Sequence, residues 1–273
     1  MNLKLIQAAR EAIGITRDGR YSWKGEERVL PARDYTAVEV VPPECGAELL
    51  GRDFSGALGG EMGRIEVTDE DSFQAAARLG RPLVLNFANA HHPGGGFLIG
   101  ARAQEEALCR SSTLYASISS EKARAMYRYN NTHPCAVESD SMLLSPEVCV
   151  FRDIACEPLE RPFLAAVVTA PAPNRRGAAL FAPGERIRNA FLRRIRIILR
   201  LAADRGYRNL VLGAWGCGAF GNDPEMVAEC FKAALEEDGF GRAFDTVVFA
   251  VCGNQEGPNP RAFRSVFGEE RRG

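Results

Sequence analysis

The sequence predicts an α/β protein in which helices cover a mixed sheet. From residue 81 onward, short apolar runs with the length of buried strands alternate with amphipathic helical stretches. Glycine-rich turns join two of these strands to the helices that follow, and such junctions are where α/β sheets bind ligands. The hydrophobic content of 46% and charged content of 25% are typical of a globular protein.

Charge, hydropathy and cysteine content exclude several classes of protein. The 273 residues include 34 basic and 35 acidic ones, and the net charge of -1 excludes a nucleic-acid binder that relies on bulk positive charge. No apolar run reaches the ~18 residues of a membrane span, and the first ten residues lack a signal peptide's apolar core. The eight cysteines form no CxxC pair, which indicates reduced, mostly buried thiols. We therefore expect a cytoplasmic protein without membrane contact or an obligatory protein partner.

The first 80 residues differ from the rest. Apolar residues at helical spacing predict a helix from Leu3 to Gly14, followed by a turn-rich stretch over 17–25. An alternating run over 35–41 stops at two prolines, and five glycines over 50–63 indicate a loop. This part offers too little apolar surface for its own core. We expect a mostly helical accessory extension, residues 1–80, packed on a catalytic domain formed by 81–273.

The elements of the core follow in a regular order. Strands are predicted over 83–87, 148–152, 165–169, 210–213 and 246–251, and helices over 104–122, from about 186 to 202, and from 223 to about 238. Asp223 and Pro224 are an N-cap and a first-turn proline. Arginines surround the apolar stripe of the 186–202 helix, which is typical of a solvated helix face.

The most informative junction runs from Asn86 to Glu106. Gly94, Gly95 and Gly96 have no Cβ, so the backbone can approach a ligand and point N–H groups at it. Gln104, Glu105 and Glu106 then begin a helix. Two interpretations of the glutamates are open. In the first, they are exposed and are found at the helix start because the helix dipole stabilises negative charge there. In the second, one holds substrate hydroxyls while the other donates a proton to a leaving oxygen.

A second glycine-rich junction runs from Gly213 to Asp223. Gly216, Gly218 and Gly221 match the GxGxxG pattern that cradles phosphates. The next strand ends in Cys252, Gly253 and Asn254 with no acidic residue to hold a ribose, and too little chain remains for a Rossmann sheet. We therefore keep the phosphate cradle and exclude hydride transfer. Phe220 either lies against a flat ring of a ligand or fills the core.

Three other features have weaker signals. Asn174 ends a proline-stiffened turn after the 165–169 strand, where it either reaches a ligand or lies on the surface. His133 and Cys135 alone approach the spacing of zinc ligands, and the adjacent His91 and His92 are typical of a loop. We expect neither a metal nor a cofactor.

These motifs together resemble the microbial type of poly(ADP-ribose) glycohydrolase, a catalytic branch of the macrodomain superfamily. The family signature is GGG, a short spacer and QEE, which here is Gly94–Gly96 and Gln104–Glu106. The segment from Asn86 to Asn89 resembles the NxAN that enters the ligand site of macrodomains. Looser similarities lie at 145–153, 168–174 and 213–224, and over 9–25 in the extension.

The resemblance implies a three-layer α/β/α macrodomain that binds ADP-ribose and hydrolyses ribose–ribose bonds. It implies Glu106 as the general acid and Glu105 as the residue that binds ribose hydroxyls. It also implies an extension that caps the terminal ribose, so that the polymer is cut from its ends. Single ADP-ribose groups on protein or nucleic acid are an alternative substrate, and a non-catalytic ADP-ribose reader is a further alternative. Ligand contacts are expected from Asn89, Gly94, Gly95, Gly96, Gln104, Asn174, Gly216, Cys217, Gly218, Ala219, Phe220 and Gly221.

Overall fold

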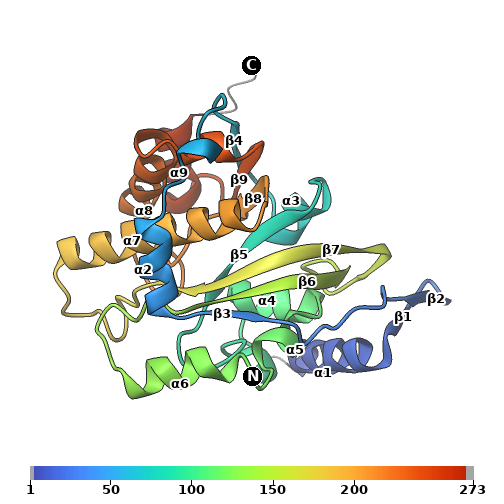
Figure 1. The fold of residues 1–273 in the computed structure, drawn as a ribbon. Coiled ribbons are helices and arrows are strands. Elements are labelled where there is room, and N and C mark those ends of the chain that lie inside the picture. The colour runs from blue at the N-terminus through green and yellow to red at the C-terminus, as the bar shows by residue number, and fades with distance from the viewer. Residues whose placement is uncertain (1–2, 269–273) are drawn as a thin grey trace. The chain divides into compact units, whose positions relative to one another are not determined.

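Two sets of segments interleave along the chain in the computed structural model, which describes residues 3–268. The first compact unit contains residues 3–41, 86–133 and 141–171. The second contains 42–85, 134–140 and 172–268. Each is described by itself (Figure 1).

The first unit is built on antiparallel strands. Its elements are α1 (Leu3–Asp18), β1 (Arg20–Trp23), β2 (Glu26–Val29), β3 (Glu39–Val41), η2 (Phe97–Ile99), α4 (Gln104–Ser111), α5 (Leu114–Ile118), α6 (Arg124–Thr132), β6 (Met142–Arg152) and β7 (Pro158–Pro171). Strand β6 pairs with both β3 and β7, and its register against β7 shifts between Ser145 and Val148. Helices α4 and α5 pack against β6.

The second unit is built on parallel strands. Its elements are α2 (Pro43–Gly51), η1 (Ser55–Ala57), β4 (Arg64–Thr68), α3 (Ser72–Ala77), α7 (Gly184–Asp204), β8 (Asn209–Leu212), α8 (Pro224–Lys232), η3 (Ala233–Glu237), η4 (Phe240–Ala243), β9 (Thr246–Ala250) and α9 (Pro258–Phe267). The first residues of β5 (Pro82–Ala88) pair with β8, which pairs with β9, and β9 pairs with β4. Helix α3 packs on β8 and β9, and α7 and α9 pack on α8.

Parallel and antiparallel pairing in one chain confirms the predicted α/β class with mixed strands. The five predicted strands are all present, and β6 and β7 are longer than expected. Asp223 caps α8 as predicted, because its side chain accepts a hydrogen bond from the N–H of Glu225. Strand β4 and helices α3, α6 and α9 were not predicted.

Several predicted boundaries in the first unit are wrong. Helix α1 continues past Gly14 to Asp18 and ends where Gly19 adopts a φ of +68°. The turn-rich stretch that follows is a hairpin, whose turn residues Lys24 and Gly25 both have positive φ. The helix predicted over 104–122 is split into α4 and α5. Ser112 is extended there because it forms a β-bridge with Val150 of β6.

The N-terminal helix is fastened to the first unit by polar contacts as well as packing. Helix α1 packs on α4 and η2 through a face that includes Ala8, Ala9 and Ala12. Arg152 of β6 reaches it with one hydrogen bond to the carbonyl of Ala8 at 3.2 Å and an ion pair to Glu11 at 2.7 Å. The division into a cap over 1–80 and a catalytic domain over 81–273 stays a prediction.

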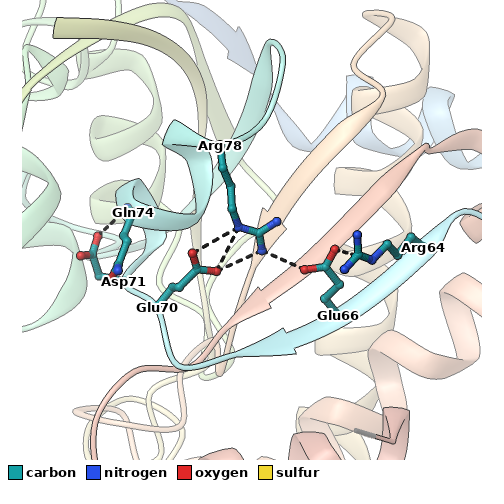
Figure 2. Close-up of polar contacts among 6 residues, drawn as sticks. All are labelled: Arg64, Glu66, Glu70, Asp71, Gln74 and Arg78. Carbon is teal, nitrogen blue, oxygen red and sulfur yellow. Dashed lines mark hydrogen bonds and ion pairs between the residues drawn. The ribbon is translucent and has the colours of Figure 1, made fainter. Parts of the chain in front are cut away.

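The β4–α3 connection of the second unit is held by a chain of ion pairs (Figure 2). Glu66 of β4 is 3% exposed and lies between Arg64, at 2.7 Å, and Arg78, at 2.8 Å. Arg78 also pairs with Glu70 at 3.0 Å. Asp71 caps α3 by accepting from the N–H groups of Phe73 and Gln74. These contacts give a short strand and a short helix a defined connection.

The cysteines are less buried than predicted. All eight are free, but only Cys109, Cys149 and Cys230 are buried, whereas Cys45 and Cys252 are exposed. The sequence places Cys252 directly after an apolar run, and the strand there ends two residues earlier. Among residues 3–268, none of the helices is long and apolar enough to cross a bilayer.

The arginines of helix α7 were predicted to lie on a solvated face, but one arginine of this helix, Arg194, is buried. Arg194 is 1% exposed and fixes the 134–140 segment, by donating to Asp140 at 3.1 Å and to the carbonyls of Val137 and Glu138 at 2.6 and 2.8 Å. Burial lowers the pKa of this guanidinium, which the charge of Asp140 opposes. Its neighbour Arg193 pairs with the same carboxylate from a half-exposed position.

Replacing Arg194 by Ala should therefore destabilise the protein by about 3–5 kcal/mol, because Asp140 and two carbonyls lose their buried partner. Replacing Arg193 by Ala is the matched control and should cost less than about 1 kcal/mol, since that pair is exposed to solvent. The free energy of unfolding in urea measures both. Equal losses for the two variants would contradict this account.

Candidate active site

The loop between β5 and α4 begins with a side-chain turn at Asn89. The Asn89 Oδ1 atom accepts hydrogen bonds from the N–H groups of His91 and His92 at 2.8 and 2.9 Å. The N–H of Asn89 is thereby directed at Glu105, whose Oε2 accepts it at 2.8 Å. The far end of the loop is closed by Gln104, whose Oε1 accepts from the N–H of Phe87 at 2.9 Å. Asn89 and Gln104 thus shape the loop in this structure.

The glycines make room for the two carboxyl groups. Gly94 and Gly95 have φ of +71° and +53°, a region that L side chains rarely adopt. A Cβ on Gly95 would lie 2.6 Å from Glu106 Oε1 and 3.2 Å from Glu105 Oε2. The N–H of Gly96 donates to Glu106 Oε1 at 2.8 Å. Gly95 and Gly96 therefore bring bare backbone against the carboxyl groups, and the approach of this backbone to a ligand stays a prediction.

Both glutamates are buried, so the interpretation as an exposed pair at a helix start is wrong. Glu105 is 3% and Glu106 7% exposed. Neighbours on a helix point about 100° apart, and the two side chains accordingly meet different partners. Glu105 faces Asn86 and Asn89 at the end of β5, with a 3.3 Å bond from Asn86 Nδ2, while Glu106 faces Gly96.

Burial raises the pKa of Glu105 to about 8. The hydrogen bonds from Asn89 and Asn86 favour the ionised form and oppose this shift, whereas the charge of Glu106 adds to it. Burial therefore favours the protonated form of Glu105 over the ionised form.

One oxygen of the pair has nothing to bind. Glu106 Oε2 is buried without a hydrogen-bond partner among the described residues, and the same is true of Asn86 Oδ1. Buried polar atoms are almost always paired in folded proteins, so an unpaired one marks the place of a ligand or a water molecule. Of the two glutamates, only Glu106 thus has a buried oxygen without a partner among the described residues.

The second group of predicted residues lies in the second unit. Asn222 is 3% exposed, and its Nδ2 donates to the carbonyls of Pro173 and Gly216 at 2.7 and 2.9 Å, which joins the two turns. Gly216 has a φ of +73°, and a Cβ there would lie 2.7 Å from that of Ala172. Asn174 is half-buried and caps its own turn by accepting from the N–H of Arg176.

The tip of this glycine-rich turn is accessible. Gly218 and Ala219 are exposed, Phe220 is half-buried, and Gly221 has a φ of +69°. Phe220 therefore does not fill the core; Trp215, which the sequence analysis did not single out, is fully buried against Phe191. Burial raises the pKa of the Cys217 thiol to about 12, so this cysteine is no nucleophile.

Comparison with known families decides the assignment. The model for the catalytic domain of microbial-type PARG matches residues 9–153, more than half of the chain. The chain belongs to the microbial-type poly(ADP-ribose) glycohydrolase (PARG) family. No curated protein matches it.

Solved PARG structures resemble the whole chain. Poly(ADP-ribose) glycohydrolase from Thermomonospora curvata is 40% identical, with a TM-score of 0.88 over 97% of this chain and 100% of that chain. The same enzyme bound to the inhibitor ADP-HPD gives 40% and 0.87, over 97% of this chain and 100% of that one. The enzyme from Deinococcus radiodurans in complex with ADP-ribose is 39% identical, with a TM-score of 0.76 over 84% of this chain and 93% of that one. This likeness confirms the predicted fold, a mixed sheet flanked by helices.

The PARG signature and the buried glutamate pair coincide, but part of the site was missed from the sequence. Helix α6 contacts the loop through Asn130, whose Nδ2 donates to the carbonyl of Ala90 at 2.8 Å, and Asn131 Oδ1 lies 2.8 Å from His91 Nδ1. Asn86, which donates to Glu105, is marked in the sequence only by its place in the NxAN motif. Helix α6 is amphipathic, but this pattern does not distinguish a helix that contacts a site from one that faces solvent, so its role depends on tertiary packing. Across residues 3–268, no cluster of three His, Cys, Asp or Glu is placed to hold a metal ion.

The raised pKa of Glu105 predicts a pH-dependent stability. The folded protein keeps this proton up to about pH 8, while an unperturbed Glu releases it near 4.5. Stability from this group is therefore complete at low pH and falls as the pH rises from about 4.5 to 8, by at most about 1.4 kcal/mol per pH unit.

Urea unfolding at several pH values measures this effect, with Glu105→Gln as the comparison because the amide cannot titrate. As the pH rises from 5 to 8, the unfolding free energy of the wild type should fall relative to that of the variant. A constant difference over that interval would show that Glu105 titrates normally.

Proposed function

We propose that this chain hydrolyses the ribose–ribose O-glycosidic bonds of poly(ADP-ribose) and releases ADP-ribose. Membership of the PARG family supports this activity, and so do the relatives solved with ADP-ribose and with ADP-HPD. The observation that carries the proposal is the buried, unpaired Oε2 of Glu106 beside a glycine loop. A pure binding module has no use for an acid at that place.

In this proposal Glu106 is the general acid. Cleavage of the glycosidic bond passes through an oxocarbenium-like state, and a proton delivered to the leaving oxygen lowers the barrier. The N–H of Gly96 holds one oxygen of Glu106 at 2.8 Å, which leaves the other to face the leaving group.

Glu105 then has the role of a sugar-binding residue. Its protonated form can both donate and accept hydrogen bonds, which suits the hydroxyl groups of a ribose. Because burial favours its neutral form, Glu105 reduces the negative charge next to Glu106. Gly94, Gly95, Gly96, Asn89 and Gln104 are proposed to line the ribose by their backbone or by shaping the loop.

The second glycine-rich turn is proposed as a phosphate-binding loop. Gly218 and Ala219 offer backbone at an exposed tip, while Gly216, which is buried, and Gly221, which is half-buried, shape the turn around it through their positive φ. Phe220 is half-exposed and suits contact with a ring. Cys217 would take part through its backbone, and Asn174 through the turn that it caps.

The finer points of the activity are also proposals. Residues 1–80 are proposed as a cap that restricts cleavage to chain ends, supported by the packing of α1 on α4, the helix that carries both glutamates. General acid catalysis by Glu106 requires no cofactor.

A cytoplasmic location is proposed as well, and the eight free cysteines support it, because the cytoplasm keeps thiols reduced.

Replacing Glu106 by Gln tests the proposal directly. The amide keeps the shape of the side chain but cannot donate the proton, so release of ADP-ribose from polymer should fall about 100-fold or more. Binding of ADP-ribose, measured by calorimetry, should change little. Cleavage at the wild-type rate would overturn the assignment.

A parallel series with Glu105→Gln and three substrates separates the alternatives. Loss of turnover in Glu105→Gln alone would assign the acid to Glu105. Release from mono-modified protein or DNA, but not from polymer, would favour a mono-ADP-ribosyl hydrolase. Binding without turnover of any substrate would indicate a reader.

The glycine loop gives a further prediction. Gly95→Ala should lower kcat/KM at least about tenfold while the protein stays folded. The new Cβ would lie 2.6 Å from Glu106 Oε1 and displace the carboxylate, and an alanine is strained at a φ of +53°. Gly59→Ala is the control, since nothing lies within 4 Å of a Cβ there. Steady-state kinetics and circular dichroism of both variants are the measurements, and equal activities would contradict the close approach.

A further inference from the structure

Tyr127 of α6 is buried with its polar group unused. The residue is 5% exposed, and its hydroxyl has no hydrogen-bond partner among residues 3–268. An unpaired buried hydroxyl costs stability, and native proteins rarely keep one without a reason. Tyr21 of the same unit shows the ordinary arrangement, because it is 7% exposed and donates to the carbonyl of Leu159 at 2.8 Å.

The position of Tyr127 on α6 is set by its neighbours. Asn130 follows one helical turn later, on the same face, and binds the loop between β5 and α4 through Ala90. Tyr127 therefore lies on the face of α6 that meets this loop.

Tyr127 is close enough to Glu105 of α4 to interact with it electrostatically. Burial raises the pKa of its phenol well above the ordinary value, and the charges of Glu105 and Cys109 raise it further. These two residues are one turn apart on α4 and share a face. The phenol thus keeps its proton at neutral pH and is available as a donor.

Two other buried polar atoms without partners belong to the same surroundings. Asn86 Oδ1 belongs to the side chain whose Nδ2 donates to Glu105, and Glu106 Oε2 belongs to the next residue of α4. A donor and two acceptors are therefore left unpaired around one pair of glutamates in the described structure. A sugar supplies what they lack, because each hydroxyl group both donates and accepts.

We propose that Tyr127 is a ligand-binding residue whose hydroxyl donates a hydrogen bond to a hydroxyl oxygen of the ribose held at Glu105 and Glu106. This inference rests on the proposed function, which it deepens by naming a residue that selects ADP-ribose over ADP. A site built to bind a substrate hydroxyl discriminates against the analogue that lacks it, since its buried polar group is then unpaired.

The test is Tyr127→Phe, which removes only the hydroxyl. Its affinity for ADP-ribose should fall about tenfold, while its affinity for ADP, which lacks the terminal ribose, should not change. The midpoint of thermal unfolding without ligand should stay equal or rise, because an unsatisfied group has been removed. Calorimetry and thermal unfolding monitored by circular dichroism give the two readouts.

Tyr21→Phe is the matched control and should behave in the opposite way. It loses a formed hydrogen bond, so its unfolding midpoint should fall while both affinities stay at the wild-type level. Wild-type affinity of Tyr127→Phe for ADP-ribose would overturn the proposal, as would equal losses for ADP-ribose and ADP or a lowered midpoint.

The outcome separates this inference from the function on which it rests. If the wild type releases ADP-ribose from polymer and Tyr127→Phe binds ADP-ribose normally, only the role of Tyr127 is refuted. If the wild type neither binds ADP-ribose nor cleaves polymer, the proposed function fails, and the assignment of Tyr127 fails with it.

Discussion

The burial of two adjacent carboxyl groups at the start of α4 is the constraint on which the site depends. Carboxyl groups out of water need hydrogen-bond donors, and the chain supplies them from backbone: Asn89 for Glu105 and Gly96 for Glu106. At Gly95 this close approach depends on the missing Cβ, which would otherwise lie 2.6 Å from Glu106 Oε1. The glycines, the asparagine turn and the helix start are therefore parts of one solution to a single electrostatic problem.

The two glycine-rich junctions solve different problems although they look alike in sequence. In the first unit, glycine admits carboxylates that are fixed inside the protein. In the second unit, Gly216 admits the methyl group of Ala172 and Asn222 bonds the turns together, which leaves an accessible tip of small residues. The first arrangement holds chemical groups in place, whereas the second presents backbone to the outside.

The sequence predicted those features that depend on local pattern. Strands marked by apolar runs, the capped start of α8 and the signature from Gly94 to Glu106 were found, because periodicity, capping and glycine chemistry are local. The break between α4 and α5 was not, since it results from pairing of Ser112 with Val150 of a distant strand. The burial of Tyr127 was not predicted for the same reason. An amphipathic helix has the same sequence pattern whether its polar residues contact water or a buried carboxyl group. Whether a polar side chain is buried is decided by tertiary packing.

The packing of α1 on α4 limits how the sequences of these two helices can vary. Three alanines of α1 pack in a face that meets α4 and η2, and Arg152 grips its backbone as well as Glu11. Small residues permit close approach, and close approach demands matched surfaces on both sides. The sequences of the leading helix and of the glutamate-bearing helix are therefore constrained together, because a larger side chain in one requires a smaller one in the other.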